Sequence, residues 1–390
     1  MAQHLHPFPA RMAPDLALDA VRSLRAPSRV LDPMCGSGTA ILTAAREGHD
    51  SIGFDLDPLA VLIARTGAHN LPRQTLLDAA SAVLQQASKL TADELHLPWI
   101  DDDDETVRYV NYWFGEPQRS DLRRLAVQLH RRRGPVADVL RLALSKIIVT
   151  KDRGASLGRD VSHSRPHKVA DASTFDVFRG YRLACERLAD LLDENHIEGA
   201  TQVVRGDARR LPRSIEQSAD LVITSPPYLN GIDYMRGHRL SLVWLGHRVS
   251  DLRRVRATSI GAERSPDQRN TEVGPILTDL ASFHDLSPQV QGMLYRFGDD
   301  MLQVVRQIRR ALKPNGRAVL VVGDSFVRGV YIANSTVVMK LAQLEGLRLL
   351  RRVERSLPPD SRYLPPPNAN VGTALSKRLR SEVVLTFAAS

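Results

Sequence analysis

The stretch Leu31-Asp-Pro-Met-Cys-Gly-Ser-Gly-Thr39 decides the fold. It includes the end of a short apolar segment, Arg29 to Asp32, and it is followed by a segment with helical spacing, Thr39 to Glu47. Gly36 and Gly38 lack a Cβ atom, so a ligand can approach the backbone closely, and the free N–H groups of the next helix face that ligand. The pattern predicts a strand, a ligand-binding loop and a helix, the first unit of a parallel α/β sheet.

The rest of the chain supplies more strands and two long insertions. Further strands are predicted at residues 51–55, 201–204, 220–224, 318–322, 347–353 and 382–387. We expect one mostly parallel sheet of about seven strands, with an antiparallel strand near the C-terminus of the chain. Residues 73–199 read mostly as helix, with a helix capped by Ser120 and a new start at Gly134-Pro135. Residues 236–289 are rich in Arg and read as loops and short helices.

Composition bounds the class of protein. The chain has 390 residues and a net charge of +9, and 46 of its 53 basic residues are Arg. This balance suits a polyanionic partner, although a GC-rich genome also produces Arg-rich proteins. The only cysteines are Cys35 and Cys185, so a disulfide scaffold and a CxxC zinc site are excluded. No apolar segment approaches the ~20 residues that span a bilayer. We expect a soluble cytoplasmic protein that does not bind membranes.

The acids around the glycine loop indicate the ligand. Asp55 ends the second predicted strand, 17 residues after Gly38, where an acid can accept hydrogen bonds from ribose hydroxyls. A nicotinamide-binding loop would have a third glycine at the position of Ile41, and its diphosphate would be repelled by Asp32. Asp32 instead suits a cationic ligand. S-adenosyl-L-methionine carries a sulfonium and an ammonium group and has no phosphate.

A second segment, Asp220-Leu-Val-Ile-Thr-Ser-Pro-Pro-Tyr228, ends another buried strand. Its two prolines fix the backbone and bring no N–H group. The Ser225 hydroxyl and the Pro226 carbonyl can then accept the two hydrogens of an exocyclic amine, and the Tyr228 ring can stack on a flipped base. A proline-stiffened loop with a buried tyrosine is the alternative interpretation.

Together these motifs resemble the SPPY-type DNA amino-methyltransferase family, which acts on cytosine N4 or adenine N6. His6-Pro-Phe-Pro-Ala-Arg11, Gly206-Asp207-Ala208 and Leu312-Lys-Pro-Asn-Gly316 also resemble family motifs. The resemblance implies a class I methyltransferase with a Rossmann-like, mostly parallel seven-stranded sheet and S-adenosyl-L-methionine as cofactor. It assigns cofactor binding to Pro9, Asp32, Gly36, Gly38, Asp55 and Asp207. It assigns catalysis to Ser225, Pro226, Pro227 and Tyr228, and no metal is expected.

The match covers residues 1–72, 200–235 and 290–390, which we expect to form the catalytic domain. Both insertions, 73–199 and 236–289, are candidates for DNA binding or target recognition. Two segments, 141–170 and 236–270, each carry an excess of five positive charges, which suits phosphate contacts or a solvated surface. His163 and His167 have no further metal ligands nearby in sequence, so zinc is disfavoured.

Serine at position 225 is most typical of cytosine-N4 enzymes, so we expect methylation of flipped-out cytosine in DNA. The alternatives are adenine-N6 methylation, guanine-N2 methylation of RNA and a catalytically silent DNA-binding subunit. Cytosine-C5 methylation needs a cysteine nucleophile, and neither Cys35 nor Cys185 lies next to a proline as that chemistry requires. The resemblance also admits a cognate restriction endonuclease as a partner.

Overall fold

The computed structural model describes residues 4–8, 11–25, 27–150, 154–159, 166–229, 234–261, 270–280, 282–327, 330–356 and 381–389. The chain divides into two compact units, each built from three stretches of sequence. The helical unit comprises Met1–Pro9, Asp57–Ile197 and Asp233–Arg256. The sheet unit comprises Ala10–Leu56, Glu198–Ile232 and Ala257–Ser390.

The sheet unit holds a seven-stranded sheet in the order β10-β11-β7-β6-β1-β2-β5. Its strands are β1 (Arg29–Asp32), β2 (Asp50–Asp55), β5 (Thr201–Arg205), β6 (Ala219–Thr224), β7 (Leu312–Val322), β10 (Leu347–Ser356) and β11 (Ser381–Ala389). The pairs along β5, β2, β1, β6 and β7 are parallel, and β11 runs antiparallel to both of its neighbours. This order confirms the predicted class I, mostly parallel α/β fold, and all seven predicted strands are present.

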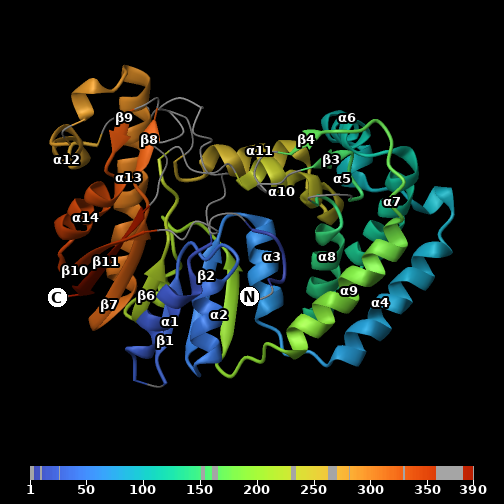
Figure 1. Cartoon of the computed structure of the whole chain (residues 1–390), viewed down its shortest axis with the longest axis horizontal. Helices are drawn as coiled ribbons and strands as arrows, with labels where there is room; N and C mark the ends of the chain where they lie inside the picture. The colour runs from blue at the N-terminus through green and yellow to red at the C-terminus, as the bar shows by residue number, and fades with distance from the viewer. Residues whose placement is uncertain are drawn as a thin grey trace. The chain divides into compact units, whose positions relative to one another are not determined.

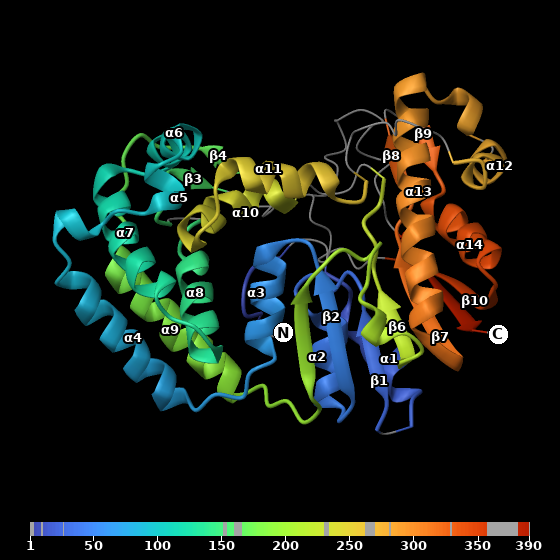
Figure 2. The ribbon, with the colours of Figure 1, turned by 180° about the vertical axis from the view of Figure 1, so that it is seen from behind.

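Helices cover both faces of this sheet (Figures 1 and 2). The remaining elements of the unit are α1 (Pro14–Arg22), α2 (Thr39–Arg46), η2 (Arg213–Ile215), α12 (Val273–Thr278), η4 (Phe283–Asp285), α13 (Pro288–Ala311), β8 (Ser325–Val327), β9 (Val330–Ile332) and α14 (Asn334–Leu344). Val30, Leu221 and Val319 pack with α1 and α2. Leu31 and Val222 point the other way and pack with α13 and α14, because successive strand side chains alternate between faces.

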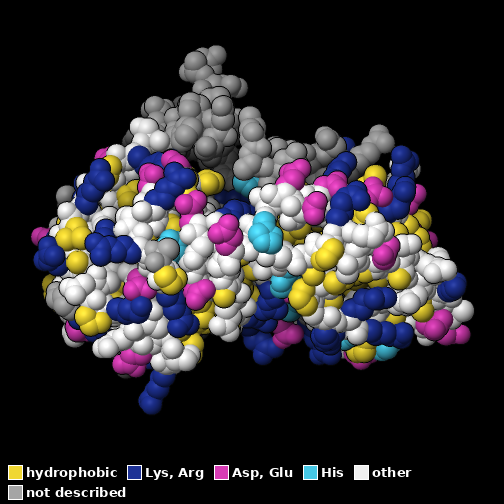
Figure 3. All heavy atoms as spheres, turned by 90° about the horizontal axis from the view of Figure 1, so that it is seen from below, with side chains coloured by type: hydrophobic (Ala, Val, Ile, Leu, Met, Phe, Trp, Pro, Cys, Tyr) yellow, Lys and Arg dark blue, Asp and Glu magenta, His cyan; other side chains and the backbone are white. Residues whose placement is uncertain are grey.

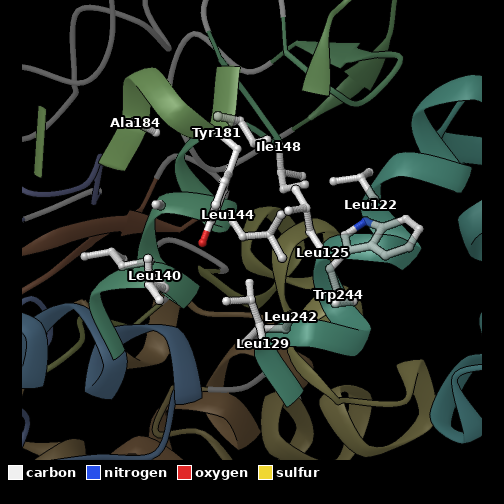
Figure 4. Close-up of a cluster of buried hydrophobic side chains, with 14 of the residues drawn as sticks. Leu122, Leu125, Leu129, Leu140, Leu144, Ile148, Tyr181, Ala184, Leu242 and Trp244 are labelled. Carbon is white, nitrogen blue, oxygen red and sulfur yellow. The ribbon is translucent and has the colours of Figure 1, made fainter. Parts of the chain in front are cut away.

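The helical unit is built around α4, α7, α8 and α9. Its elements are α3 (Pro58–Gly67), α4 (Arg73–Ser88), η1 (Ala92–Glu94), α5 (Pro98–Asp101), α6 (Asp104–Trp113), α7 (Glu116–His130), α8 (Pro135–Lys146), β3 (Gly158–Arg159), β4 (His167–Lys168), α9 (Val177–Asp193), α10 (Tyr234–Leu242), η3 (Val243–Leu245) and most of α11 (Val249–Thr258). Figure 4 shows its core, where Leu122, Leu144 and Tyr181 meet Leu242 and Trp244 from the later segment. No described helix is long and apolar enough to cross a bilayer.

Two local expectations differ from the structure. Ser120 lies inside α7 and not at its start, because Gly115 caps the helix and a proline follows in its first turn. The predicted insertion 236–289 is divided at Arg256 between the two units, and α3, which we grouped with the catalytic domain, packs in the helical unit. By contrast, Gly134 and Pro135 start α8 as expected.

Candidate active site

The glycine loop connects β1 to α2 and lies against β2. Gly36 and Gly38 have φ angles of 50° and 87°, in the left-handed region that glycine adopts without strain. Gly38 is also the N-cap residue of α2. The Cys35 N–H donates to the carbonyl of Phe54 at 2.8 Å, which fixes the loop to the second strand. The predicted loop geometry is therefore present.

Asp32 ends β1 and is 3% exposed. Its Oδ1 accepts a hydrogen bond from the Met34 N–H at 3.1 Å. Burial raises the pKa of Asp32 to about 7, and the charge of Asp55 adds to that effect, whereas the Thr224 hydroxyl and the Met34 N–H oppose it. Among the described residues, no cationic side chain stabilises this carboxylate. A buried acid of this kind fits a ligand that brings its own positive charge, as S-adenosyl-L-methionine does.

Asp55 ends β2, and its position is set by the loop. Its Oδ2 accepts a hydrogen bond from the Gly36 N–H at 2.8 Å. The same strand end is joined to β5, because the Gly206 N–H donates to the Asp55 carbonyl at 3.0 Å. The carboxyl ends of three neighbouring strands, β1, β2 and β5, therefore carry Asp32, Asp55 and Asp207. Open α/β sheets bind their ligands at these strand ends.

Asp207 takes part in an ion-pair network that the sequence did not predict. Arg209 donates to both Asp207 oxygens, at 2.7 Å from Nη2 and 2.9 Å from Nε, and to Asp300 of α13 at 2.6 Å. Burial alone would raise the pKa of Asp207, but the Arg209 hydrogen bonds outweigh it and hold that pKa below its usual value. The network keeps Asp207 ionised and orients its carboxylate. Its predicted contact with the adenine amine remains a prediction.

Ser225, Pro226, Pro227 and Tyr228 follow β6, which pairs with β1 in parallel. Thr224, fully buried, ends β6 near Asp32, so the SPPY tetrapeptide leaves the sheet beside the glycine loop. Within the described part of the chain, the Ser225 hydroxyl forms no hydrogen bond. Burial raises the pKa of Tyr228 to about 12, and the charge of Glu382 on β11 contributes, so the phenol is neutral at physiological pH.

The described residues of the N-terminal motif, His6 to Phe8, belong to the helical unit. His6 is buried, and its Nε2 lies 2.9 Å from the Ser145 hydroxyl. The ring of Phe8 lies 5.4 Å from that of His238, which in turn contacts the Asp57 carboxylate through Nδ1 at 2.5 Å. Pro9 lies outside the described residues, so its predicted cofactor contact is untested.

Two further structural features beside the predicted site residues were not found from the sequence. Gly53 allows the glycine loop to lie against β2, since a Cβ there would be 2.7 Å from Ile41 Cδ1 and 3.0 Å from Cys35 Cβ. Glu382, buried on β11, pairs with Arg355 at 3.2 Å and influences Tyr228. The sequence Ser51-Ile-Gly-Phe-Asp55 contains a glycine within a predicted strand, which was the only indication of the close packing at Gly53. The sequence around Glu382 gave no indication of its position near Tyr228.

The charged surface is mixed, and no metal site is present among the described residues. No cluster of three His, Cys, Asp or Glu side chains could hold an ion there, and His163 is outside the described part. Asp103, in the acidic segment 101–105, caps α6 by accepting from the Thr106 N–H, and Asp101 pairs with Arg123. Figure 3 shows one face, on which Lys and Arg lie among Asp and Glu, hydrophobic and uncharged side chains.

Comparisons with known proteins agree with the motifs. No family model matches the chain. The Type II methyltransferase M.BsoBI of Geobacillus stearothermophilus is 24% identical over 273 residues, which are 59% of this chain and 50% of that protein. The Type II methyltransferase M.MvaI of Kocuria varians is 19% identical over 435 aligned positions, covering 99% of this chain and 90% of that protein. The chain thus matches about half the length of the first relative.

Two solved structures are also similar. A TehB-like SAM-dependent methyltransferase from Corynebacterium glutamicum is 11% identical, with 96% of this chain and 87% of that chain covered and a TM-score of 0.32. A SAM-dependent methyltransferase from Methanosarcina mazei is 9% identical, with 97% and 98% covered and a TM-score of 0.35. These scores are too low to establish the fold, which rests on the strand order. The chain is thus similar along its length to a Type II methyltransferase, and its motifs are consistent with the DNA amino-methyltransferases, whose cofactor is S-adenosyl-L-methionine.

Proposed function

We propose that this protein transfers a methyl group from S-adenosyl-L-methionine to the exocyclic N4 amine of cytosine in DNA. The observation that carries the proposal is the pairing of β1 with β6, which puts the end of the glycine loop strand beside the SPPY tetrapeptide. Asp32 and Thr224 are close enough for the hydroxyl to lower the pKa of the acid. A bound cofactor and a base held by Ser225 to Tyr228 would therefore be neighbours.

The residues at the carboxyl ends of these strands have different roles. Asp32 stabilises the positive end of the cofactor, Asp55 holds its ribose hydroxyls, and Asp207 accepts from its adenine amine. The cofactor, when bound, supplies an electrophilic methyl group on its sulfonium. The remaining requirement is a nucleophile in the right place, so positioning supplies most of the rate.

The target amine needs its lone pair released from the ring. The Ser225 hydroxyl and the Pro226 carbonyl accept its two hydrogens, which draws the nitrogen toward a tetrahedral geometry and directs the lone pair at the methyl group. Pro227 fixes the backbone between them and Tyr228, on whose ring the flipped base stacks. No covalent intermediate on the protein is needed.

The choice of cytosine rests on Ser225. A neutral hydroxyl is a weaker acceptor than a carboxylate, and the family resemblance associates serine here with cytosine N4. The deciding experiment is enzymatic digestion of methylated DNA to nucleosides, followed by mass spectrometry. N4-methylcytosine supports the proposal. N6-methyladenine as the only product would establish the adenine enzyme, and transfer to RNA alone would favour guanine-N2 methylation of RNA.

Replacing Asp55 by Ala should weaken cofactor binding at least tenfold, about 1.4 kcal/mol or more. The variant loses the ribose acceptor and also the 2.8 Å bond that holds Gly36. Isothermal titration calorimetry measures the affinity. Asp55→Asn is the matched control because its amide oxygen still accepts from Gly36, so it should lose less than Asp55→Ala. Wild-type affinity in Asp55→Ala would show that Asp55 is not the ribose ligand.

Cofactor affinity should rise with pH as Asp32 ionises. The pKa of Asp32 is about 7, so a cationic ligand selects the ionised form and releases a proton below that pH. We expect a roughly tenfold gain in affinity between pH 6 and pH 7.5. The stability of the ligand-free protein depends on pH in the opposite direction. Because its pKa is raised, Asp32 binds a proton more tightly in the folded than in the unfolded chain. The free energy of unfolding therefore falls as pH rises from about 4 to about 7.

Calorimetry in two buffers of different ionisation enthalpy detects the released proton. Asp32→Asn should bind more weakly with a flat pH profile, and S-adenosylhomocysteine, which lacks the sulfonium charge, should show a shallower one. A wild-type affinity that is constant across this range would mean that Asp32 does not sense the cofactor's charge.

A further inference from the structure

The helical unit contains a cavity that the methyl-transfer site does not use. Its volume is about 560 Å³, and it is lined by Tyr109, Trp113, Pro166, His167, Arg236 and Arg239. Two rings come from α6, two arginines from α10, and the others from the β3–β4 ribbon and the residue before it. Figures 1 and 2 show these three elements together in the helical unit. A volume of this size accommodates a nucleotide-sized ligand.

The described residues that line the cavity include cationic side chains and no acid. Arg236 and Arg239 are three residues apart on α10, which places them on one face of the helix. The Nε of Arg239 is buried and has no hydrogen-bond partner among the described residues. A buried donor without an acceptor is costly, so this group is suited to a ligand that brings one. No Asp or Glu is among the lining residues, and burial raises the pKa of Tyr109, so its phenol stays neutral.

Aromatic rings alternate with these cations. The Arg239 guanidinium lies 5.8 Å from the centre of the Tyr109 ring, and Tyr109 and Trp113 are 6.2 Å apart. Tyr112, 55% exposed, packs edge-on against Trp113 at 5.1 Å. The Lys168 ammonium lies 5.3 Å from the Tyr112 ring and also pairs with Asp171. Rings interleaved with cations are the arrangement by which proteins hold unstacked bases and their phosphates.

Residues of both basic segments line this cavity, although the first segment contributes Pro166 and His167 and none of its described Lys or Arg side chains. His167 belongs to the segment 141–170, and Arg236 and Arg239 belong to 236–270. This part of the second segment packs in the helical unit, where Arg236 and Arg239 supply the cationic side chains of the cavity. We infer that this cavity binds a phosphodiester group of DNA and that the adjoining base stacks on the Tyr112–Trp113 pair. The inference rests on the proposed function, since it names where that DNA is held.

Salt-dependent DNA binding tests the arginines. Arg236→Ala and Arg239→Ala should each weaken binding to all sequences alike, and each should make the log–log salt slope on duplex DNA shallower by about 0.9. The DNA affinity and its salt slope are both measured by fluorescence anisotropy of a labelled oligonucleotide. The salt concentration is varied from about 50 to about 200 mM, where phosphate contacts dominate the affinity. Arg182→Ala is the matched control, because Arg182 is 58% exposed on α9, pairs with Glu186 and does not line the cavity.

A second pair of variants tests the stacking. Tyr112→Ala should weaken binding to single-stranded DNA roughly 5- to 150-fold, and Tyr112→Phe, which keeps the ring, should restore it. Since Tyr112 is mostly exposed, its removal should leave the melting temperature unchanged. Equal loss in both variants would count against stacking.

The outcomes separate this inference from the proposed function. If the wild-type protein methylates DNA but the arginine variants keep its affinity and salt slope, the cavity inference is wrong and the function stands. If the wild type binds cofactor and methylates no DNA, the function is wrong, and the salt slopes still decide whether the cavity holds nucleic acid. Arg239-dependent binding of free deoxycytidine monophosphate without any effect on DNA binding would also overturn the inference.

Discussion

We expect the replacement of Tyr228 by Ala to lower kcat/KM for methyl transfer roughly 5- to 150-fold, because a ring that contributes about 1–3 kcal/mol of base stacking is removed. Affinity for S-adenosyl-L-methionine should stay near that of the wild type, because the proposed cofactor contacts come from the ends of β1, β2 and β5. Transfer of a labelled methyl group to DNA and calorimetry with the cofactor measure the two effects separately.

Tyr228→Phe is the matched control. The phenol is neutral at physiological pH because its pKa is about 12, so the ring and not the hydroxyl is the proposed contact. We expect the Phe variant to retain most of the activity. If Phe were as impaired as Ala, the hydroxyl would be the functional group, and the stacking role would be wrong.

Trp244→Ala should lower the free energy of unfolding of the helical unit by about 3–5 kcal/mol. Trp244 is 1% exposed, and its ring packs edge-on against Phe114 at 5.1 Å. Truncation would leave a large apolar cavity where α7, α8 and α9 meet the segment 233–256 (Figure 4). Urea unfolding of the full chain, followed by far-UV circular dichroism, measures the change.

Because the chain has two units and both contain helices, the relevant transition is the one that shifts in Trp244→Ala. Tyr112→Ala serves as the control, since an exposed residue of the same unit should change stability by about 0.5 kcal/mol or less. A loss below about 1 kcal/mol in Trp244→Ala would show that residues 233–256 are not part of this core.

The parallel sheet was predictable because local sequence determines it. Each strand is a short apolar segment between turn residues, and the glycine loop and SPPY tetrapeptide mark two strand ends directly. Parallel strands place those ends at one edge, which brings Asp32, Asp55 and Ser225 together without any knowledge of the rest. The start of α7 was misjudged because Ser120 is a good cap, but Gly115 and the early proline are stronger signals.

The division of the second insertion was not predictable in the same way. Leu242 and Trp244 have ordinary helical spacing, and nothing local says which of two cores they enter. Arg209 and Asp300 are 91 residues apart, and Asp57 and His238 are 181 apart, so their pairing depends on the completed fold. Long-range ion pairs of this kind leave no pattern in the sequence, and the Arg-rich composition obscures them further.

The place of β11 has a consequence for synthesis of the protein. On the ribosome, β7 emerges before β11, which is the last strand of the sheet in chain order but lies between β7 and β10. Until it is inserted, Val319 to Val322 form an apolar strand with an open edge that can pair with another nascent chain. Translation that stops before residue 381 would leave that edge permanently open. Pairing of β11 with β7 and β10 therefore completes the sheet and covers this exposed strand edge.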